Sequence, residues 1–259
     1  MHLIITGCEY SGTTTLSLAI GVWGTEIFGG NTFEPNSFHD HWKLPHINNW
    51  SPATSDQSKQ IMAKHPDARE GDFTRTGLTD EEQQMVLNLT PKLKEMVQRY
   101  HLEYHIQPSF YKQPDHNMVG AYIEEAVYGP LYFGYGGPGQ KGDRAKSVRA
   151  YEERILDKAP DTVFVLVKAT PDVIRKRMEN KPHVNGVVKD TDIEHVLMLF
   201  DSAYESSLLH QKITIDTSTS TIEESLAEFV DKIKPHLTEV DLQRILDHEQ
   251  NNKGMQAGS

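Results

Sequence analysis

The stretch that decides the fold is LIITGCEYSGTT, residues 3–14. It begins with an apolar run typical of a buried strand, continues through a glycine-bounded polar loop, and leads into a helix. Leu16, Ile20 and Trp23 share one face of that helix. A loop of spacing G-x-x-x-x-G-x-[ST] lets backbone N–H groups surround phosphate oxygens, and the helix start adds its positive end. The pattern predicts a phosphate-binding loop, with Thr14 placed to offer its hydroxyl to Mg²⁺.

The last third of the chain alternates strand and helix patterns. Residues 162–167 form a continuous apolar run, which predicts a strand covered on both faces, and residues 212–216 predict another strand. Helices are expected from Pro171, from Ile193 and, after a capping box, from Thr221. This alternation predicts a three-layer α/β/α domain with a central parallel sheet.

The middle of the chain is less regular. Residues 24–52 look irregular, residues 51–78 predict a long loop, and a capping box at 79–82 predicts a helix start. We expect residues 102–107 to be extended and 117–123 to form a strand, and the last ten residues to be a frayed tail. The helical face expected to be buried here consists of Met85, Leu89, Leu93, Met96 and Tyr100.

Composition excludes several classes of protein. Twenty-six Lys and Arg against 37 Asp and Glu give a net charge of −11, which disfavours broad binding to nucleic acid. No apolar run approaches the roughly 20 residues that cross a bilayer, and residues 1–6 lack a secretory pattern. The single cysteine, Cys8, excludes an intrachain disulfide. We expect a cytoplasmic protein with a small-molecule ligand; the oligomeric state is open, a homodimer included.

The glycine loop resembles the Walker A loop of P-loop NTPases, and among them the adenylate-kinase-like nucleoside and nucleotide kinases. The resemblance implies a P-loop domain over residues 1–240, a substrate-side insertion at 29–115, and a helix end and tail at 241–259. It also implies that the loop binds ATP or another nucleoside triphosphate. This chain departs from the family at one position, because Thr13 stands where the family has the lysine that reaches the phosphates. The residues so implied to hold the nucleotide are Gly7, Tyr10, Ser11, Gly12, Thr13, Thr14 and Thr15.

A second resemblance covers the same residues. The run from Ser11 to Thr14 is similar to the 5′-phosphosulfate loop of sulfotransferases, which bind the sulfate donor PAPS. The basic residue that precedes this run in sulfotransferases is replaced by Tyr10. The chain therefore lacks the basic residue that each of the two families has in this loop. The sequence of the loop alone does not decide between the two resemblances.

Residues 168–189 are locally basic, with six Lys and Arg against two acids. By resemblance to nucleotide kinases this segment corresponds to the lid, whose arginines close over the phosphates. The resemblance implies that Arg175 and Arg177 stabilise the transferring group, and either could supply the cation missing at Thr13. The alternative is an ordinary solvated helix face.

A kinase also needs a group that prepares the acceptor hydroxyl, and two carboxylates qualify. Glu124, with Glu125 beside it, is expected at the end of the strand at 117–123, and Asp40 after a second strand. An N-cap or a surface charge is the alternative role for each. The aromatic and glycine-rich residues 128–139 are expected to form a loop that contacts substrate or packs the insertion onto the core.

The function that best fits these patterns is a Mg²⁺-dependent phosphotransferase that uses ATP on a small acceptor. The alternatives are a PAPS-dependent sulfotransferase and a nucleotide-binding protein without catalytic activity.

Overall fold

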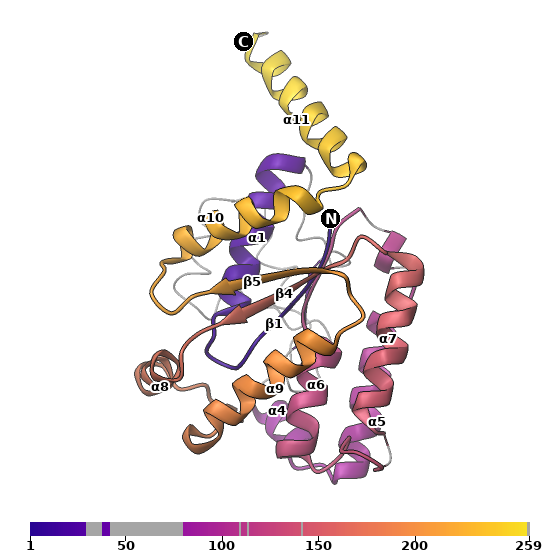
Figure 1. The fold of residues 1–259 in the computed structure, drawn as a ribbon, viewed down its shortest axis with the longest axis vertical. Helices are drawn as coiled ribbons and strands as arrows, with labels where there is room; N and C mark the ends of the chain where they lie inside the picture. Colours follow the sequence, from indigo (N-terminus) through magenta and orange to yellow (C-terminus); the bar gives the residue numbers. More distant parts are fainter. Residues whose placement is uncertain (30–37, 42–79, 109, 113, 141, 258–259) are drawn as a thin grey trace.

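A computed structural model of the chain describes residues 1–29, 38–41, 80–108, 110–112, 114–140 and 142–257. Its centre is a parallel five-stranded sheet in the order β2-β3-β1-β4-β5. Figure 1 labels β1, β4 and β5 of this sheet. In register, Ile4 of β1 lies between Met118 of β3 and Phe164 of β4. The strands are β1 (His2–Thr6), β2 (Phe38–His41), β3 (His116–Gly120), β4 (Val163–Lys168) and β5 (Gln211–Asp216).

Helices cover both faces of the sheet, which confirms the predicted three-layer α/β/α architecture. Helices α1 (Thr13–Phe28) and α10 (Ile222–Ile233) lie on one face, and α6 (Ala121–Tyr128) and α9 (Ile193–Ser206) lie on the other (Figure 1). The remaining α-helices are α4 (Asp80–Leu87), α5 (Pro91–His105), α7 (Arg144–Lys158), α8 (Pro171–Asn180) and α11 (Glu239–Ala257). Short turns of other helix types occur at Phe110–Lys112, Gly129–Phe133, Asp190–Asp192 and Lys234–His236. Among the described residues, no helix combines the length and apolarity that crossing a membrane requires.

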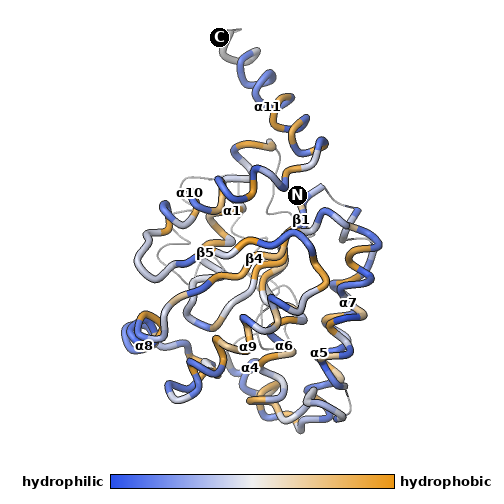
Figure 2. Tube along the Cα trace, in the orientation of Figure 1, coloured by the Kyte–Doolittle hydropathy of each residue, from blue (hydrophilic) through white to orange (hydrophobic). Residues whose placement is uncertain are grey.

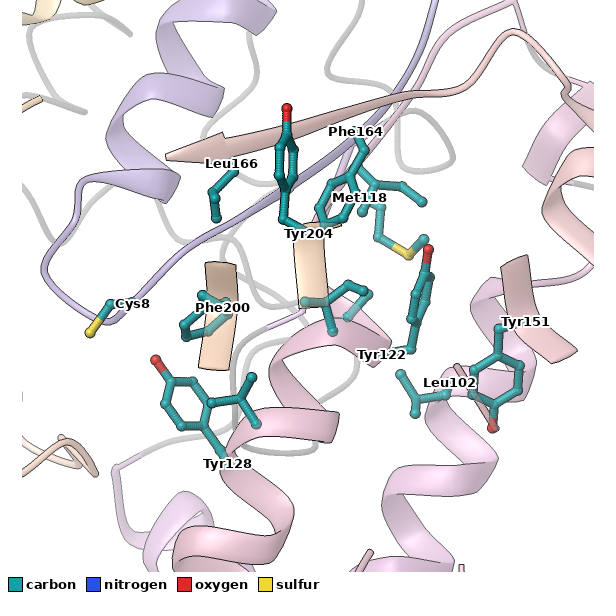
Figure 3. Packing of buried hydrophobic residues seen from close by; sticks show 14 of the residues in the cluster. Cys8, Leu102, Met118, Tyr122, Tyr128, Tyr151, Phe164, Leu166, Phe200 and Tyr204 are labelled. Atoms are coloured by element: carbon teal, nitrogen blue, oxygen red, sulfur yellow. The ribbon is translucent and has the colours of Figure 1, made fainter. Parts of the chain in front are cut away.

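Successive side chains of β1 point to opposite faces of the sheet, and the core therefore has two parts. Leu3 and Ile5 pack toward α1 and α10, whereas Ile4 packs toward α6 and α9. The second part is rich in aromatic rings, and Figure 3 shows Tyr122 and Phe164 among them. Both faces of the central strands are thus apolar, so these strands are the most hydrophobic part of the trace in Figure 2.

The buried face of α5 differs from the expected one. Leu93, Met96 and Tyr100 of α5 are exposed, Tyr100 by 74%, and so is Met85 of the preceding helix α4. The buried residues of α5 are instead polar for the most part: Glu95, Gln98, His101, Leu102 and His105. The reason is that α5 faces polar partners on α6 and α7, among them Glu125 and Arg144, rather than an apolar surface.

Four predicted boundaries were also wrong. Helix α5 continues to His105, so residues 102–105 are helical rather than extended. The strand predicted at 117–123 ends at Gly120, because Gly120 and Ala121 have φ values of 78° and 55° and turn the chain into α6. Residues 250–257 continue α11 instead of forming a frayed tail, and residues 24–28, expected to be irregular, complete α1. The long loop expected at 51–78 and the capping residue Thr79 lie outside the described residues.

Candidate phosphate-binding site

The glycine loop lies at the point where ligands bind in parallel α/β sheets. It joins the carboxyl end of β1 to α1, and β1 has β3 on one side and β4 on the other. Connections therefore leave the middle of the sheet in opposite directions, which opens a crevice outside the carboxyl ends of the strands. The sequence predicts that the glycine loop lies between a strand and a helix, and the structure confirms this placement.

Two glycines shape the loop. A side chain at Gly7 would place its Cβ 2.3 Å from the carbonyl oxygen of Val167, so only glycine lets β1 approach β4 this closely. Gly12 has φ 96° and precedes the first turn of α1. Tyr10 also adopts the left-handed region, with φ 68°, which is uncommon for a residue with a side chain. The loop is thus held in a conformation that most sequences avoid.

Some of the loop amides are bonded within the protein and others are not. The Ser11 N–H donates to the Cys8 carbonyl at 2.9 Å, and the Glu9 N–H donates to the Tyr128 hydroxyl at 2.9 Å. The N–H groups of Gly12 and Thr13 have no acceptor among the described residues. They stand at the start of α1, where amides lack an intrahelical partner and the helix dipole favours an anion.

The Ser11 hydroxyl is a further unpaired group in this loop. Its Oγ is buried and has no hydrogen-bond partner within the part of the chain that the structure describes. A buried hydroxyl without a partner costs about 1–3 kcal/mol, so the site accommodates a ligand oxygen better than an apolar group. Thr13, Thr14 and Thr15 follow in the first turn of α1 and are half-buried.

Arg177 lies beside the glycine loop and bonds its backbone. Its Nη1 donates to the Tyr10 carbonyl at 2.9 Å and to Thr217 Oγ1 at 3.0 Å, and its Nη2 donates to the Thr217 carbonyl at 2.6 Å. Thr217 Oγ1 in turn donates to the Ser11 carbonyl at 2.6 Å. Burial lowers the pKa of Arg177 from its ordinary value. Helix α8, the end of β5 and the loop are thereby joined through one guanidinium.

Arg175 lies elsewhere. Its Nε donates to Asp190 at 2.7 Å and its Nη2 to Glu194 at 2.5 Å, and Asp172 lies 3.3 Å from Nη1. The hydrogen bonds that Arg175 donates to Glu194 and Asp190 raise its pKa. The side chain therefore pairs with the start of α9 rather than with the loop, and of the two predicted arginines the structure brings only Arg177 to the phosphate loop.

The candidate acids lie on two elements. Glu124 is buried in the first turn of α6, and its charge helps to raise the pKa of Tyr128, after the larger effects of burial and of Cys8. Glu124 therefore lies near the tyrosine that contacts the loop. Asp40 is within β2, paired with Val119, instead of after the strand; its side chain lies outside the described residues.

The neighbour of Glu124, Glu125, faces away from the loop into a buried polar network. It accepts hydrogen bonds from Gln98 at 2.7 Å, from the Tyr135 hydroxyl at 2.9 Å and from Arg144 at 3.3 Å. Both acids were expected at the end of a strand, and both lie in helix α6 instead. Residues 129–133 of the aromatic and glycine-rich segment form a short helical turn instead of the expected loop. Phe133 and Tyr135 of this segment are buried in the core.

Glu9 is a site residue that the sequence did not reveal. Its carboxylate is 2% exposed and contacts His183, 174 positions later in the chain. Spacing within the loop carries no signal for this contact, because it depends on how residues after α8 return to the sheet.

No protein-family model and no curated protein matches the chain. Three solved structures cover it almost completely. The YorR protein of Bacillus subtilis in complex with phosphorylated GDP is 13% identical, with a TM-score of 0.47, 92% of this chain and 99% of its own chain covered. Thymidylate kinase of Ehrlichia chaffeensis is 16% identical, with a TM-score of 0.43 and coverages of 90% and 98%. Deoxyadenosine kinase of M. mycoides with bound dATP is 12% identical, with a TM-score of 0.48 and coverages of 90% and 99%.

At these identities and scores, the likenesses do not assign an activity to the chain. The parallel three-layer architecture and the glycine loop at the end of its central strand do confirm the predicted P-loop fold.

Proposed function

We propose that this chain is a phosphotransferase that transfers a phosphoryl group from a nucleoside triphosphate, with ATP as the expected donor, to a small acceptor. The observation that carries the proposal is the glycine loop at the carboxyl end of β1, where the amides of Gly12 and Thr13 and the hydroxyl of Ser11 have no partner among the residues that the structure describes. Such a group of donors at a helix start suits an oxyanion with several oxygens.

Each candidate residue has a role in this proposal. The loop from Gly7 to Thr15 binds the phosphates through amides that are not bonded within the described part of the protein, among them those of Gly12 and Thr13. The half-buried Thr14 hydroxyl is an oxygen ligand of the kind that Mg²⁺ prefers. Mg²⁺, when bound, neutralises charge on the phosphate oxygens. Arg177 holds the loop and adds positive charge beside it, and Arg175 orders the start of α9. Glu124, or Asp40 at the neighbouring edge of the sheet, accepts the proton of the acceptor hydroxyl.

A thermal-shift comparison is the first test. ATP–Mg²⁺ and GTP–Mg²⁺ are expected to raise the melting temperature, and PAPS is not. Stabilisation by PAPS alone would indicate the sulfotransferase. Nucleotide binding without transfer to any nucleoside, nucleotide or other small alcohol would indicate a binding protein, the alternative that the missing lysine at Thr13 favours.

A pair of variants makes the test specific to the loop. Thr14→Val removes the proposed Mg²⁺ ligand and is expected to abolish the difference between nucleotide binding with and without Mg²⁺. Thr25→Val is the matched control, because Thr25 lies near the other end of α1, where its hydroxyl donates to the Gly21 carbonyl at 3.1 Å. Equal loss of Mg²⁺ dependence in both variants, or in neither, contradicts the assignment of Thr14.

A further inference from the structure

Residues 183–188, which follow α8, return over the phosphate loop; we call them the capping segment. Glu9 and Tyr10 of the loop hold this segment at several points. Asn185, buried in the segment, donates to Gln83 of α4 at 2.9 Å, so the segment also reaches the helix at the other side of the site. The capping segment therefore contacts both Glu9 of the glycine loop and Gln83 of α4.

The Glu9 carboxylate is surrounded by donors from the capping segment. Its Oε2 accepts from the backbone N–H groups of Val187 and Val188 at 3.0 and 3.1 Å. Its Oε1 lies 2.7 Å from His183 Nδ1. A buried carboxylate is costly unless hydrogen bonds compensate its charge, so Glu9 strongly favours the position of the segment in which these donors reach it.

Tyr10 holds the same segment from the next position of the loop. Its ring stacks on His183 with centroids 4.1 Å apart, and its hydroxyl accepts from the His183 N–H at 2.9 Å. Gly186 packs so closely that a Cβ there would lie 3.2 Å from the Tyr10 hydroxyl and 3.5 Å from Glu9 Oε1. The Tyr10 carbonyl meanwhile accepts from Arg177, so one loop residue contacts both α8 and the segment that follows it.

These contacts make the loop conformation and the segment position depend on each other. Tyr10 has the left-handed φ that shapes the loop, and its neighbour Glu9 loses three donors if the capping segment moves away. Lys181 and Lys189 flank the segment, so its position also decides where two exposed cations lie relative to the phosphates.

We propose that Glu9 is a positioning residue that couples the capping segment to the phosphate loop, so that nucleotide binding and closure of the segment favour each other. The part of this inference that concerns nucleotide binding rests on the proposed function. The contact between Glu9 and the capping segment is independent of the proposed function. Glu9 acts through the segment and the loop backbone, and its carboxylate takes no part in the reaction.

Amide hydrogen exchange tests the contact without ligand. Glu9→Gln conserves the volume of the side chain and removes its charge, and it is expected to speed exchange over residues 183–188 about tenfold, as the loss of a charged hydrogen bond implies. Exchange in β4 and β5 is expected to stay as in the wild type, which shows that the variant folds. Glu179→Gln is the matched control, because Glu179 is an exposed carboxylate at the end of α8 and its loss should leave the segment unchanged.

ATP–Mg²⁺ then tests the coupling. In the wild type and in Glu179→Gln, nucleotide is expected to slow exchange over 183–188; in Glu9→Gln this slowing should be lost and the Kd for ATP should rise about tenfold. Tyr10→Phe, which removes one hydroxyl, should give the same changes with smaller size. Unchanged exchange in ligand-free Glu9→Gln, or an unchanged Kd, overturns the proposal. A wild-type protein that binds no nucleotide overturns the proposed function, and the ligand-free comparison still decides the contact.

Discussion

The buried ion network around Arg144 allows a sharp test of what holds α5, α6 and α7 together. Arg144 is 1% exposed, and it donates to Glu125 at 3.3 Å and to Glu95 at 3.2 Å. Its guanidinium also lies 5.2 Å from the centre of the Tyr135 ring. Replacement of Arg144 by Met keeps most of the aliphatic volume but leaves two buried carboxylates without this cation.

The expected loss of stability is large. Removal of one partner from a buried ion pair costs about 3–5 kcal/mol, because the remaining charge is left uncompensated. A domain of ordinary stability unfolds with about 5–15 kcal/mol, so the change is a substantial share of the total. Arg149→Met is the matched control on the same helix. Arg149 is 69% exposed and lies 3.6 Å from Glu153, a surface pair whose loss should cost below about 1 kcal/mol.

The loss should also depend on pH. Burial raises the pKa of Glu125, and the charge of Arg144 is the largest influence that opposes this rise. An acid whose pKa is higher in the folded state than in the unfolded state destabilises the fold when the pH lies above its unfolded-state pKa. This destabilisation disappears as the pH falls below the unfolded-state pKa. Without Arg144 the pKa of Glu125 rises further. The difference in unfolding free energy between wild type and Arg144→Met should therefore be larger at pH 8 than at pH 5.

Urea denaturation followed by circular dichroism measures these differences. The double variant Arg144→Met/Glu125→Gln is expected to recover part of the lost stability at pH 8, because it removes the uncompensated charge. A loss below about 1 kcal/mol, comparable with that of Arg149→Met, would refute the reasoning about burial. An equal loss at both pH values, without recovery in the double variant, would refute the role given to Glu125.

Three further variants test the phosphate loop. Gly7→Ala should unfold the protein or displace the loop, because its Cβ would lie 2.3 Å from the Val167 carbonyl oxygen; a native melting temperature with unchanged nucleotide affinity would contradict this. Thr217→Val removes the hydroxyl that joins Arg177 to the loop and should cost about 1–3 kcal/mol of stability in thermal or urea unfolding. Arg177→Ala should lower the turnover number more than it raises KM. Lys176 is an exposed neighbour, and Lys176→Ala should change neither quantity. Equal effects of the two variants would contradict the role of Arg177.

Local patterns were sufficient for the parts of the fold that bury apolar strands or cap helices. The run at 162–167 predicted β4, and the Thr221 capping box is present with both of its hydrogen bonds. Both features depend on neighbours within a few positions. The glycine loop belongs to the same class, because its spacing encodes its own backbone shape.

Long-range polar pairing explains what the sequence could not predict. The buried face of α5 is marked by Glu95 and Gln98, whose partners lie 49 and 27 positions away on other helices. The sequence does not show which distant residues these side chains contact. Periodicity therefore selects the more hydrophobic stripe, which contains Met96 and Tyr100, although the structure exposes both residues. The end of β3 was missed for a local reason, since the positive φ of Ala121 is rare for alanine.

The missing lysine of the loop has a physical consequence that follows from these contacts. A lysine at position 13 would organise phosphates by direct contact, whereas in this chain Arg177 and Thr217 bond the carbonyls of Tyr10 and Ser11. Carbonyls that are held from behind fix the direction of the neighbouring N–H groups before a ligand arrives. Donors fixed in advance need no reorganisation when charge develops, which is the main source of electrostatic stabilisation in enzyme sites. The backbone conformation of the glycine loop, held by Arg177 and Glu9, would thus replace in part the positive charge that Thr13 does not supply.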